Sequence, residues 1–308
     1  MNHLFRSLLK PLTGVGVIGT FSHLTFKTEN KHLKMAYSGV AAQVVSDIIF
    51  HPIDLININT KYNFQNKTNS VDTFNKVYKQ YGFRGFYRGL DVLILSSAIY
   101  GFAYYTIYKY VKESILNAYK GDDEMNFVAY TLASISGELI LIFYYPFDMI
   151  KTRILSFSVS YKNLYQGLKE IIDKTSVTKS IRNLYSGFIP TTILHSSWSM
   201  ILLVSFEMCR DYIAKRKGIL SSEVMGWDYF FASCFSGVVT ASFTNVMEVY
   251  TIQKQVHGDS VTTKSFMKSQ FFYAMRSGIG IRMFYGIFYT IVLLENINMF
   301  GRFFGIHL

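Results

Sequence analysis

Charged side chains are scarce in this sequence. Only 17% of the 308 residues are charged, whereas soluble domains carry about 25%, and half of the residues are hydrophobic. Residues 92–108 and 283–294 contain no charge, and residues 188–206 contain only His195. Runs close to 20 residues match the hydrocarbon core of a bilayer, which is about 30 Å thick. The composition therefore argues against a large soluble helical core and favours a protein that spans a membrane.

Cysteine is also rare, with two residues, Cys209 and Cys234. They form no Cys-x-x-Cys motif and have no histidine cluster nearby, so neither a disulfide framework nor a zinc site is supported. No catalytic pairing or cofactor-binding loop stands out, because Gly278-Ile279-Gly280 is too short to be a dinucleotide fingerprint. We therefore expect no enzyme activity, no cofactor and no metal site.

Positive charge is in excess and unevenly placed. The net charge is +11, and residues 57–88, 151–186 and 251–285 carry six basic against one acidic, seven against two, and five against one residue. Residues 109–125 and 207–228 are nearly neutral. This alternation is typical of hydrophobic hairpins in which every second loop lies on the same side of a membrane. A nucleic-acid-binding patch is the competing interpretation. Because the basic residues are divided among three similar linkers, we expect no nucleic acid partner.

Two motifs recur with the same period. The first is Pro-x-Asp with a weaker third copy, and its acids, 94 and 100 residues apart, are Asp54, Asp148 and Glu248. The second is aromatic-x-Gly, and its glycines, 98 and 99 residues apart, are Gly89, Gly187 and Gly286. Two independent motifs that share a period of about one hundred residues indicate three tandem repeats.

Each repeat is interpreted as two membrane-spanning helices joined by a polar linker. The first helix carries small residues four apart, which allow close helix approach: Gly39/Gln43, Ala133/Gly137 and Ser233/Gly237. Pro52 and Pro146 are expected to kink this helix. Amphipathic segments at 71–80, 165–174 and 264–273 are expected to lie at the membrane interface. The prediction is an all-α membrane protein of six transmembrane helices in three pseudo-symmetric repeats.

The predicted boundaries are 35–120, 121–218 and 219–308 for the repeats, which together form one transport domain, and 1–34 for an N-terminal tail. Residues 1–28 hold Arg6, Lys10 and Lys27, several Ser and Thr, and no acid. This composition fits an organelle-targeting segment, although it has no clear amphipathic period. An ordinary tail fits it equally well.

These motifs resemble the mitochondrial carrier family over residues 35–304. The family pattern is Pro-x-[Asp/Glu]-x-x-[Lys/Arg] on odd-numbered helices, followed by Gly, four residues, an aromatic, a basic residue and Gly. Repeat two matches the first part with Pro146, Asp148 and Lys151, and repeat one matches the second with Gly82, Tyr87, Arg88 and Gly89. The resemblance implies a monomeric multi-pass protein of the mitochondrial inner membrane that transports a small solute by alternating access. It also implies contact with the bilayer, with cardiolipin at the matrix-side motifs.

In the family, acids and bases on odd-numbered helices pair to close a gate on the matrix side. The resemblance assigns four residues to this gate: Asp54, Asp148, Lys151 and Glu248. We expect Lys151 to pair with Glu248, whereas Asn57 faces Asp148 and Thr251 faces Asp54 in place of bases. A structural role is the alternative, in which Asp54 and Asp148 only brace the kinked helix ends.

The opposite, cytoplasmic gate of the family uses aromatic-[Asp/Glu]-x-x-[Lys/Arg] on even-numbered helices. Residues 206–210 match it fully, with Glu207 and Arg210. The second helix has Lys109 in the acid's place and Lys112 in the base's place, and residues 304–308 hold no charged pair. The resemblance thus implies an incomplete gate of Glu207, Arg210 and Lys112, which leaves strict coupled exchange open.

In the family, substrate contacts lie about two turns beyond the aromatic-x-Gly glycine. Here those positions are Ser96, Leu194, His195 and Leu293, and none of them is an arginine. The acids on the spans are Asp47, Glu138 and Glu295. Fixed cations would be needed for a nucleotide or a di- or tricarboxylate, so the pattern favours a cationic or zwitterionic solute.

The segment Ser46-Asp47-Ile48-Ile49 is also similar to the equivalent stretch of mitochondrial S-adenosylmethionine carriers. Each of these polar groups has helix packing as its alternative role, and His195 could contact a metal or simply be hydrogen-bonded. The incomplete gates leave a second functional class open, a carrier-derived scaffold or adaptor without transport activity.

Overall fold

The computed structural model describes residues 31–66, 68–118, 123–172 and 176–303, and every regular element within them is helical. The long helices are α3 (Lys31–Tyr62), α5 (Leu90–Ala118), α10 (Phe188–Lys217), α11 (Trp227–His257) and α14 (Ile279–Phe303). The third span consists of α6 (Asp123–Gly137), the 3-10 turn η4 (Glu138–Ile140) and α7 (Leu141–Leu155). The all-α prediction is confirmed.

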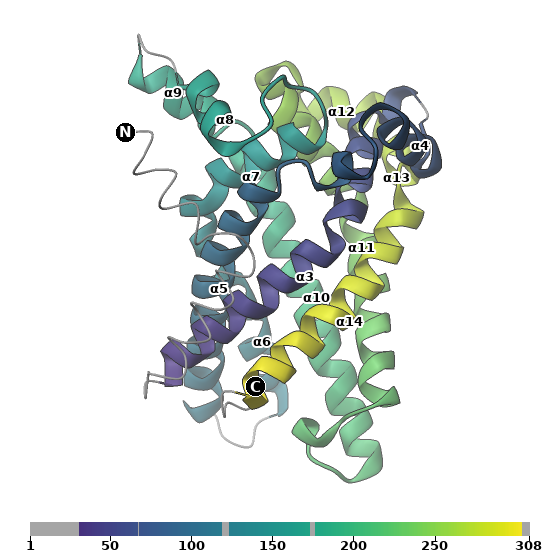
Figure 1. Ribbon diagram of the computed structural model, residues 1–308. Helices are drawn as coiled ribbons and strands as arrows, with labels where there is room; N and C mark the ends of the chain where they lie inside the picture. The colour runs from purple at the N-terminus through teal and green to yellow at the C-terminus, as the bar shows by residue number, and fades with distance from the viewer. Residues whose placement is uncertain (1–30, 67, 119–122, 173–175, 304–308) are drawn as a thin grey trace.

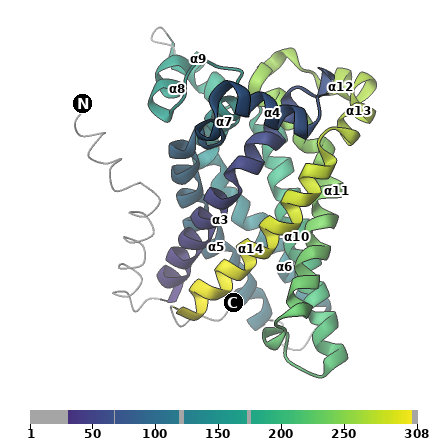
Figure 2. The ribbon, with the colours of Figure 1, turned by 45° about the vertical axis from the view of Figure 1, so that its right-hand side comes forward.

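The long helices form a closed ring (Figure 1). In chain order, α3 packs on α5, α5 on α6 and α7, α6 on α10, α10 on α11, and α11 on α14. The ring closes because α14 packs back on α3, and Figure 2 shows these two helices side by side. Residues from the first and last spans therefore face a common interior.

Five helical stretches in the described part of the chain are long and apolar enough to cross a membrane: Ala36–Tyr62, Phe83–Ala118, Phe127–Leu155, Thr178–Lys217 and Trp227–His257. The sixth helix of the ring, α14, has 25 residues, and its apolar stretch Ile279–Leu293 is shorter than the others. A 25-residue helix rises about 38 Å, which is enough for the hydrocarbon core.

Glycines of the predicted small-residue pairs lie where helices touch. A Cβ on Gly39 would lie 2.7 Å from the carbonyl oxygen of Gly101, and one on Gly237 would lie 2.5 Å from that of Gly286. A Cβ on Gly137 would lie 2.6 Å from the ring of Tyr104. Larger residues would force these helices apart, so the predicted close approach is confirmed.

Pro52 lies inside α3 and Pro146 inside α7. In the third span, the change of helix geometry is the 3-10 turn η4, which precedes Pro146 in the sequence. Such a turn within a helix often marks a hinge or a functional site. Kinks centred on the two prolines stay predictions, whereas η4 places Glu138 in the middle of this span.

Short helices gather at one end of the ring (Figure 1): α4 (Ser70–Tyr81), α8 (Leu164–Ile171), α9 (Val177–Leu184), α12 (Thr263–Ser269) and α13 (Phe271–Arg276). We call this end the short-helix end. Asn69, Asn163 and Thr262 cap α4, α8 and α12, each accepting a hydrogen bond from a backbone N–H in the first turn. The predicted amphipathic segment 71–80 is thus helical, and 264–273 is divided between α12 and α13. The described part of 165–174 is helical up to Ile171, and residues 173 and 174 lie outside the described residues.

Candidate functional site

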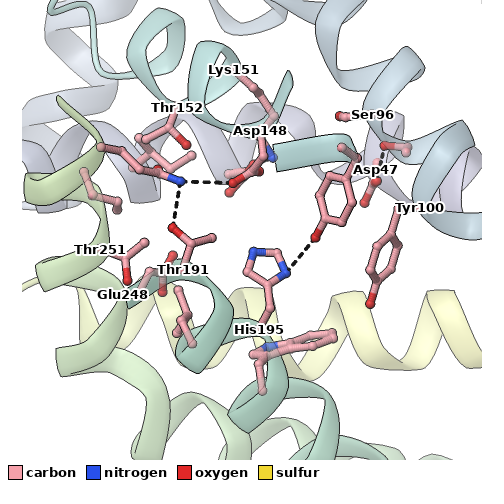
Figure 3. A pocket seen from close by; sticks show the side chains of 18 of the residues that line it. Asp47, Ser96, Tyr100, Asp148, Lys151, Thr152, Thr191, His195, Glu248 and Thr251 are labelled. Atoms are coloured by element: carbon pink, nitrogen blue, oxygen red, sulfur yellow. Dashed lines mark hydrogen bonds and ion pairs between the residues drawn. The ribbon is translucent and has the colours of Figure 1, made fainter. Parts of the chain in front are cut away.

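All the long helices contribute side chains to one cavity inside the ring. It comprises about 990 Å³ of empty space, part of it open to solvent. The charged residues that line it are Asp47, Asp54, Asp148, Lys151, Glu248 and Arg282. The aromatic residues are Tyr100, Tyr144, Trp198, Tyr285 and Tyr289. Figure 3 shows Asp47, Asp148, Lys151 and His195 around the same opening.

Most of the predicted solute contacts line this cavity, namely Asp47, Ser96, Leu194 and His195. Leu293 is the exception, and its prediction as a solute contact is wrong because it does not line the cavity. It is only 3% exposed and belongs to a buried hydrophobic cluster with Ala42 and Tyr229. Burial of its apolar side chain among other apolar residues is favourable, and Tyr285 and Tyr289 form the α14 wall instead. The side chain of Glu295 lies outside the described residues.

Asp47 is held by neutral donors from three helices. Its Oδ2 accepts hydrogen bonds from the Ser97 hydroxyl of α5 and from Gln43 Nε2 at 3.0 Å, one turn earlier in α3. Its Oδ1 accepts one from the Tyr289 hydroxyl of α14 at 2.8 Å. In the described part of the chain, no basic side chain forms an ion pair with Asp47. Its negative charge is solvated by dipoles, and Lys151, which pairs with Asp54, acts on it only through space.

Glu138, in η4, is the second acid of this layer and is 2% exposed. Its Oε1 accepts hydrogen bonds from the Tyr100 hydroxyl at 2.9 Å and from the Ser199 hydroxyl. Its Oε2 has no hydrogen-bond partner among the described residues and lies 3.9 Å from His195 Nδ1. The Tyr144 hydroxyl lies 3.0 Å from the same nitrogen.

Towards the short-helix end, Lys151 pairs with Asp54, with 3.1 Å between Nζ and Oδ2. The expected Lys151–Glu248 ion pair is wrong. Glu248 forms ion pairs with other basic side chains, and Lys151 pairs with Asp54, the acid of the preceding repeat. Around a ring of three repeats, an acid can face the base of either neighbour, and sequence spacing alone does not select the direction.

The expected polar partners are corrected in the same way. Asn57 donates to Glu248, with 2.8 Å between Nδ2 and Oε1, and does not face Asp148. Asp148 instead accepts from Gln255 Nε2 at 3.1 Å. The Thr251 hydroxyl donates to the carbonyl of Pro190 at 3.3 Å, so its recorded partner is not Asp54.

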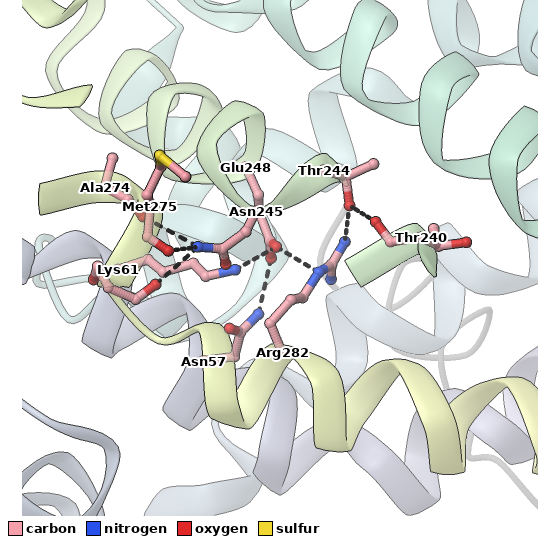
Figure 4. A network of polar contacts seen from close by, with 10 residues as sticks. Asn57, Lys61, Thr240, Thr244, Asn245, Glu248, Ala274, Met275 and Arg282 are labelled. Carbon is pink, nitrogen blue, oxygen red and sulfur yellow. Dashed lines mark hydrogen bonds and ion pairs between the residues drawn. The ribbon is translucent and has the colours of Figure 1, made fainter. Parts of the chain in front are cut away.

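Two basic residues that the motifs did not indicate bind Glu248 (Figure 4). Lys61 Nζ lies 2.5 Å from Glu248 Oε2, and Arg282 Nε lies 2.8 Å from the same oxygen. Lys61 is fully buried. A signal was present, because Lys61 follows Asn57 by one helical turn and so lies on the same face of α3. A base displaced by one turn still reaches the acid.

At the other end of the ring, the predicted gate residues come together around Glu207. Lys112 Nζ of α5 lies 2.7 Å from Glu207 Oε1, and Arg210 contacts Oε2. The Tyr108 hydroxyl donates to Glu207 at 3.5 Å. The predicted gap in this gate, at residues 304–308, lies outside the described residues. The assignment of these groups to a gate stays a prediction.

Residues 28–119 and 123–217 match the family model of mitochondrial carrier proteins. The chain belongs to the mitochondrial carrier family. It is 27% identical to an uncharacterized mitochondrial carrier of Schizosaccharomyces pombe, over 68% of this chain and 73% of the relative. It is 23% identical to the mitoferrin of Dictyostelium discoideum, over 74% of each chain. It is 26% identical to the chloroplastic nicotinamide adenine dinucleotide transporter 1 of Arabidopsis thaliana, over 72% of this chain and 73% of the relative.

Members of this family are transporters, and their fold carries solutes across membranes. Together with the membrane-length apolar helices, the family makes this carrier a multi-pass membrane protein of mitochondria. The similar proteins include one named for a dinucleotide, so membership alone leaves the class of solute open.

Proposed function

We propose that this carrier moves a small cationic or zwitterionic solute across the mitochondrial inner membrane by alternating access. The observation that carries the proposal is Asp47, whose carboxylate lines the central cavity and is bound only by neutral groups. The cavity lining as a whole has four acids, Asp47, Asp54, Asp148 and Glu248, against two bases, Lys151 and Arg282. Four minus two leaves a net charge of −2, and Lys61, which pairs with Glu248 from outside the lining, reduces it to −1.

A carboxylate inside a membrane is costly unless a positive charge approaches it. A cationic group on the solute would provide that charge, whereas a free anion would be repelled. Both bases of the lining are already committed, Lys151 to Asp54 and Arg282 to Glu248. A nucleotide or a dicarboxylate would have to break those ion pairs to gain a counter-ion.

The aromatic wall favours an organic cation. Tyr285 and Tyr289 stack with ring centroids 4.9 Å apart, and Trp198 meets Tyr289 edge-on at 6.3 Å. Tyr100 and Tyr144 form an edge-on pair at 5.3 Å. Aromatic faces attract cations and also bind planar or apolar groups. S-adenosylmethionine is one solute of this chemistry, and a metal ion is a simpler alternative.

A scaffold without transport activity is the second candidate. The incomplete motifs favour it, since polar residues stand where the family has bases. Polar groups from every span converge on a central cavity. This arrangement supports transport, because a scaffold would not require a polar cavity.

Orientation and lipid contacts belong to the same proposal. The short-helix end would face the matrix, and the carrier would act as a monomer. A groove beside the start of α10 is lined by Arg153, Arg182, Lys254 and His257. Basic grooves between membrane helices suit the phosphates of cardiolipin.

Uptake into proteoliposomes tests the proposal. Labelled S-adenosylmethionine, arginine, ATP and malate would be compared in wild type and in Asp47→Asn, which keeps the shape of the side chain and removes its charge. The matched control is Asp72→Asn, which makes the same change at an exposed position on α4. We expect a cation to be transported, and Asp47→Asn to slow it about tenfold or more, since one lost ionic contact of about 1.4 kcal/mol has that effect.

Rapid exchange of ATP or malate that is insensitive to Asp47→Asn would overturn the proposed solute class. Failure of the folded protein to transport any member of a wider panel would favour the scaffold.

A further inference from the structure

We propose that Glu138 and His195 form a site for one exchangeable proton, and that the carrier exchanges its solute for this proton. The site itself is argued from its own geometry. The direction of coupling rests on the proposed function, because it follows from the positive charge of the solute.

A proton bound at Glu138 would compensate for a hydrogen-bond donor that its carboxyl group lacks. Its carboxyl group is buried in the third span, and Oε2 receives no hydrogen bond from any described residue. Leaving a charged oxygen buried without a donor is expensive. The 3.9 Å between Oε2 and His195 Nδ1 is too long for a hydrogen bond. A modest side-chain movement would close it once a proton is available.

His195 connects this carboxyl group to the cavity. Glu138 does not line the cavity, whereas His195 does, and the imidazole is 29% exposed. Figure 3 shows the imidazole reaching into the opening from α10, and the Tyr144 hydroxyl lies 3.0 Å from its Nδ1. A proton from solvent in the cavity can therefore reach Glu138 through the histidine.

Two states of the pair follow. With the proton bound, either Glu138 is a neutral acid that donates to Nδ1, or His195 is an imidazolium facing a carboxylate. The pair is then neutral overall. Without the proton, Nδ1 keeps its contact with the Tyr144 hydroxyl, 3.0 Å away, and the pair carries one negative charge. Only a proton is gained or lost, and no electron moves.

The other titratable groups around Glu138 do not neutralise it. Those that act on it come from three elements: Tyr100, Tyr104 and Tyr105 of α5, Tyr144 and Asp148 of α7, and His195 of α10. Five of the six are neutral or negative, and only His195 can become a cation. Glu138 therefore depends on this histidine or on a proton.

Proton and solute compete because both add positive charge to the same cavity. Each must weaken the binding of the other, and the two effects are equal by linkage. A cation that enters from one side releases the proton there. The empty carrier then binds a proton, which removes a buried charge and lowers the cost of reorientation. The cycle moves solute and proton in opposite directions.

The first test needs no solute. Proton binding by the purified carrier would be measured by difference titration of wild type against Glu138→Gln. Glutamine keeps an oxygen for Tyr100 and Ser199 but cannot ionise. Glu170→Gln, on the exposed face of α8, is the control that removes a carboxyl group exposed to solvent. We expect the proton that Glu138→Gln lacks to leave wild type at a different pH from the proton that the control variant lacks.

His195→Gln provides an independent check if Glu138→Gln fails to fold. We expect the pH at which the Glu138 proton is released to move when the histidine is removed. Unchanged titration in both variants, beyond the loss of an ordinary acid, would overturn the site.

The second test measures coupling in proteoliposomes, with the membrane potential clamped and a pH dye inside. The probe is whichever cation the panel identifies. We expect an acidic interior to accelerate uptake and uptake to raise the internal pH. At one-for-one exchange of a monovalent cation, one pH unit sustains about a tenfold solute gradient. In Glu138→Gln, the ratio of uptake with and without the gradient should fall to one, whereas Glu170→Gln should behave as wild type.

The outcomes separate the two proposals. Cation uptake that depends on Asp47 but moves no proton would overturn the coupling alone. A proton site without any cation transport would leave the site intact and remove the proposed solute. Entry of solute and proton together would also refute the exchange, because it is the direction expected for an anion.

Discussion

Two sets of buried or half-buried acids face the interior of this carrier, and they are neutralised in different ways. Asp54 and Glu248, near the short-helix end, are bound by Lys151, Lys61 and Arg282 at 2.5 to 3.1 Å. We call these two the gate acids. Asp47 and Glu138 are bound by hydroxyl and amide groups. His195 lies 3.9 Å from Glu138, and Lys151 acts on Asp47 through space without forming an ion pair with it.

The difference indicates two uses of buried charge. An acid with a fixed cation holds two helices together and is not available to a solute. An acid without one attracts a mobile positive charge, whether a solute or a proton. Three of these four acids line the same cavity together with Asp148, which accepts a hydrogen bond from Gln255, so position alone does not separate the sets. The two sets differ in their binding partners, and mutations can test this difference.

The largest effect on stability is expected at Glu248. Glu248→Ala leaves Lys61 and Arg282 buried without their shared carboxylate, which should cost about 3–5 kcal/mol. The measurement is thermal unfolding of the purified carrier in detergent. Glu170→Ala, at an exposed position, is the control. A loss no greater than that of the control would show that the gate acids are not structural.

A smaller effect should identify the partner of Lys151. A double-mutant cycle with Asp54→Asn and Lys151→Gln should give a coupling of about 0.5–3 kcal/mol, the range for residues in contact. The cycle of Lys151→Gln with Glu248→Gln should give less. A larger coupling of Lys151 with Glu248 than with Asp54 would support the Lys151–Glu248 pairing predicted from the motifs.

At the opposite end of the ring, Glu207 has two cationic partners. Lys112→Met should therefore cost only about 1 kcal/mol, because Arg210 still balances the carboxylate. Combining it with Arg210→Met should cost more than the two single changes together. Simple additivity in thermal unfolding would mean that the two bases do not share Glu207.

The smallest effect on stability is expected at Asp47. In Asp47→Asn, the remaining oxygen can accept from Ser97 and Gln43 while Nδ2 donates to the Tyr289 hydroxyl. The change also removes a half-buried charge, so stability should change by less than about 1 kcal/mol. Transport should fall strongly in the same variant. A stability loss like that of Glu248→Ala would show that Asp47 is a structural acid, and the division into two sets of acids would be wrong.

The sequence was sufficient for the architecture, because the determinants of a membrane helix are local. Length and apolarity identify a span, and Gly39, Gly137 and Gly237 mark close helix contacts on the chain itself. The three amphipathic segments follow from periodicity within a few turns. The same reasoning predicted most of the cavity residues that were proposed. The positions of Asp47, Ser96, Leu194 and His195 follow from their distance along a single helix from a repeated motif, and all four line the cavity. The prediction for Leu293 was wrong, because its distance from the motif along the helix does not determine which face of the helix points into the cavity.

Partnership between helices was decided only by the tertiary structure. Which base meets which acid depends on the direction in which the ring closes and on reach across it, and a long side chain such as Lys61 can serve from a neighbouring turn. Arg282 reaches Glu248 from a different helix of the same repeat, and Glu138 meets His195 across the interface between the third and fourth spans. Electrostatic energy depends on distances in space, and spacing along one helix does not determine distances between helices. The sequence alone therefore determined which charges are buried, and the packing of the ring decided which of them are neutralised and which remain for a solute or a proton.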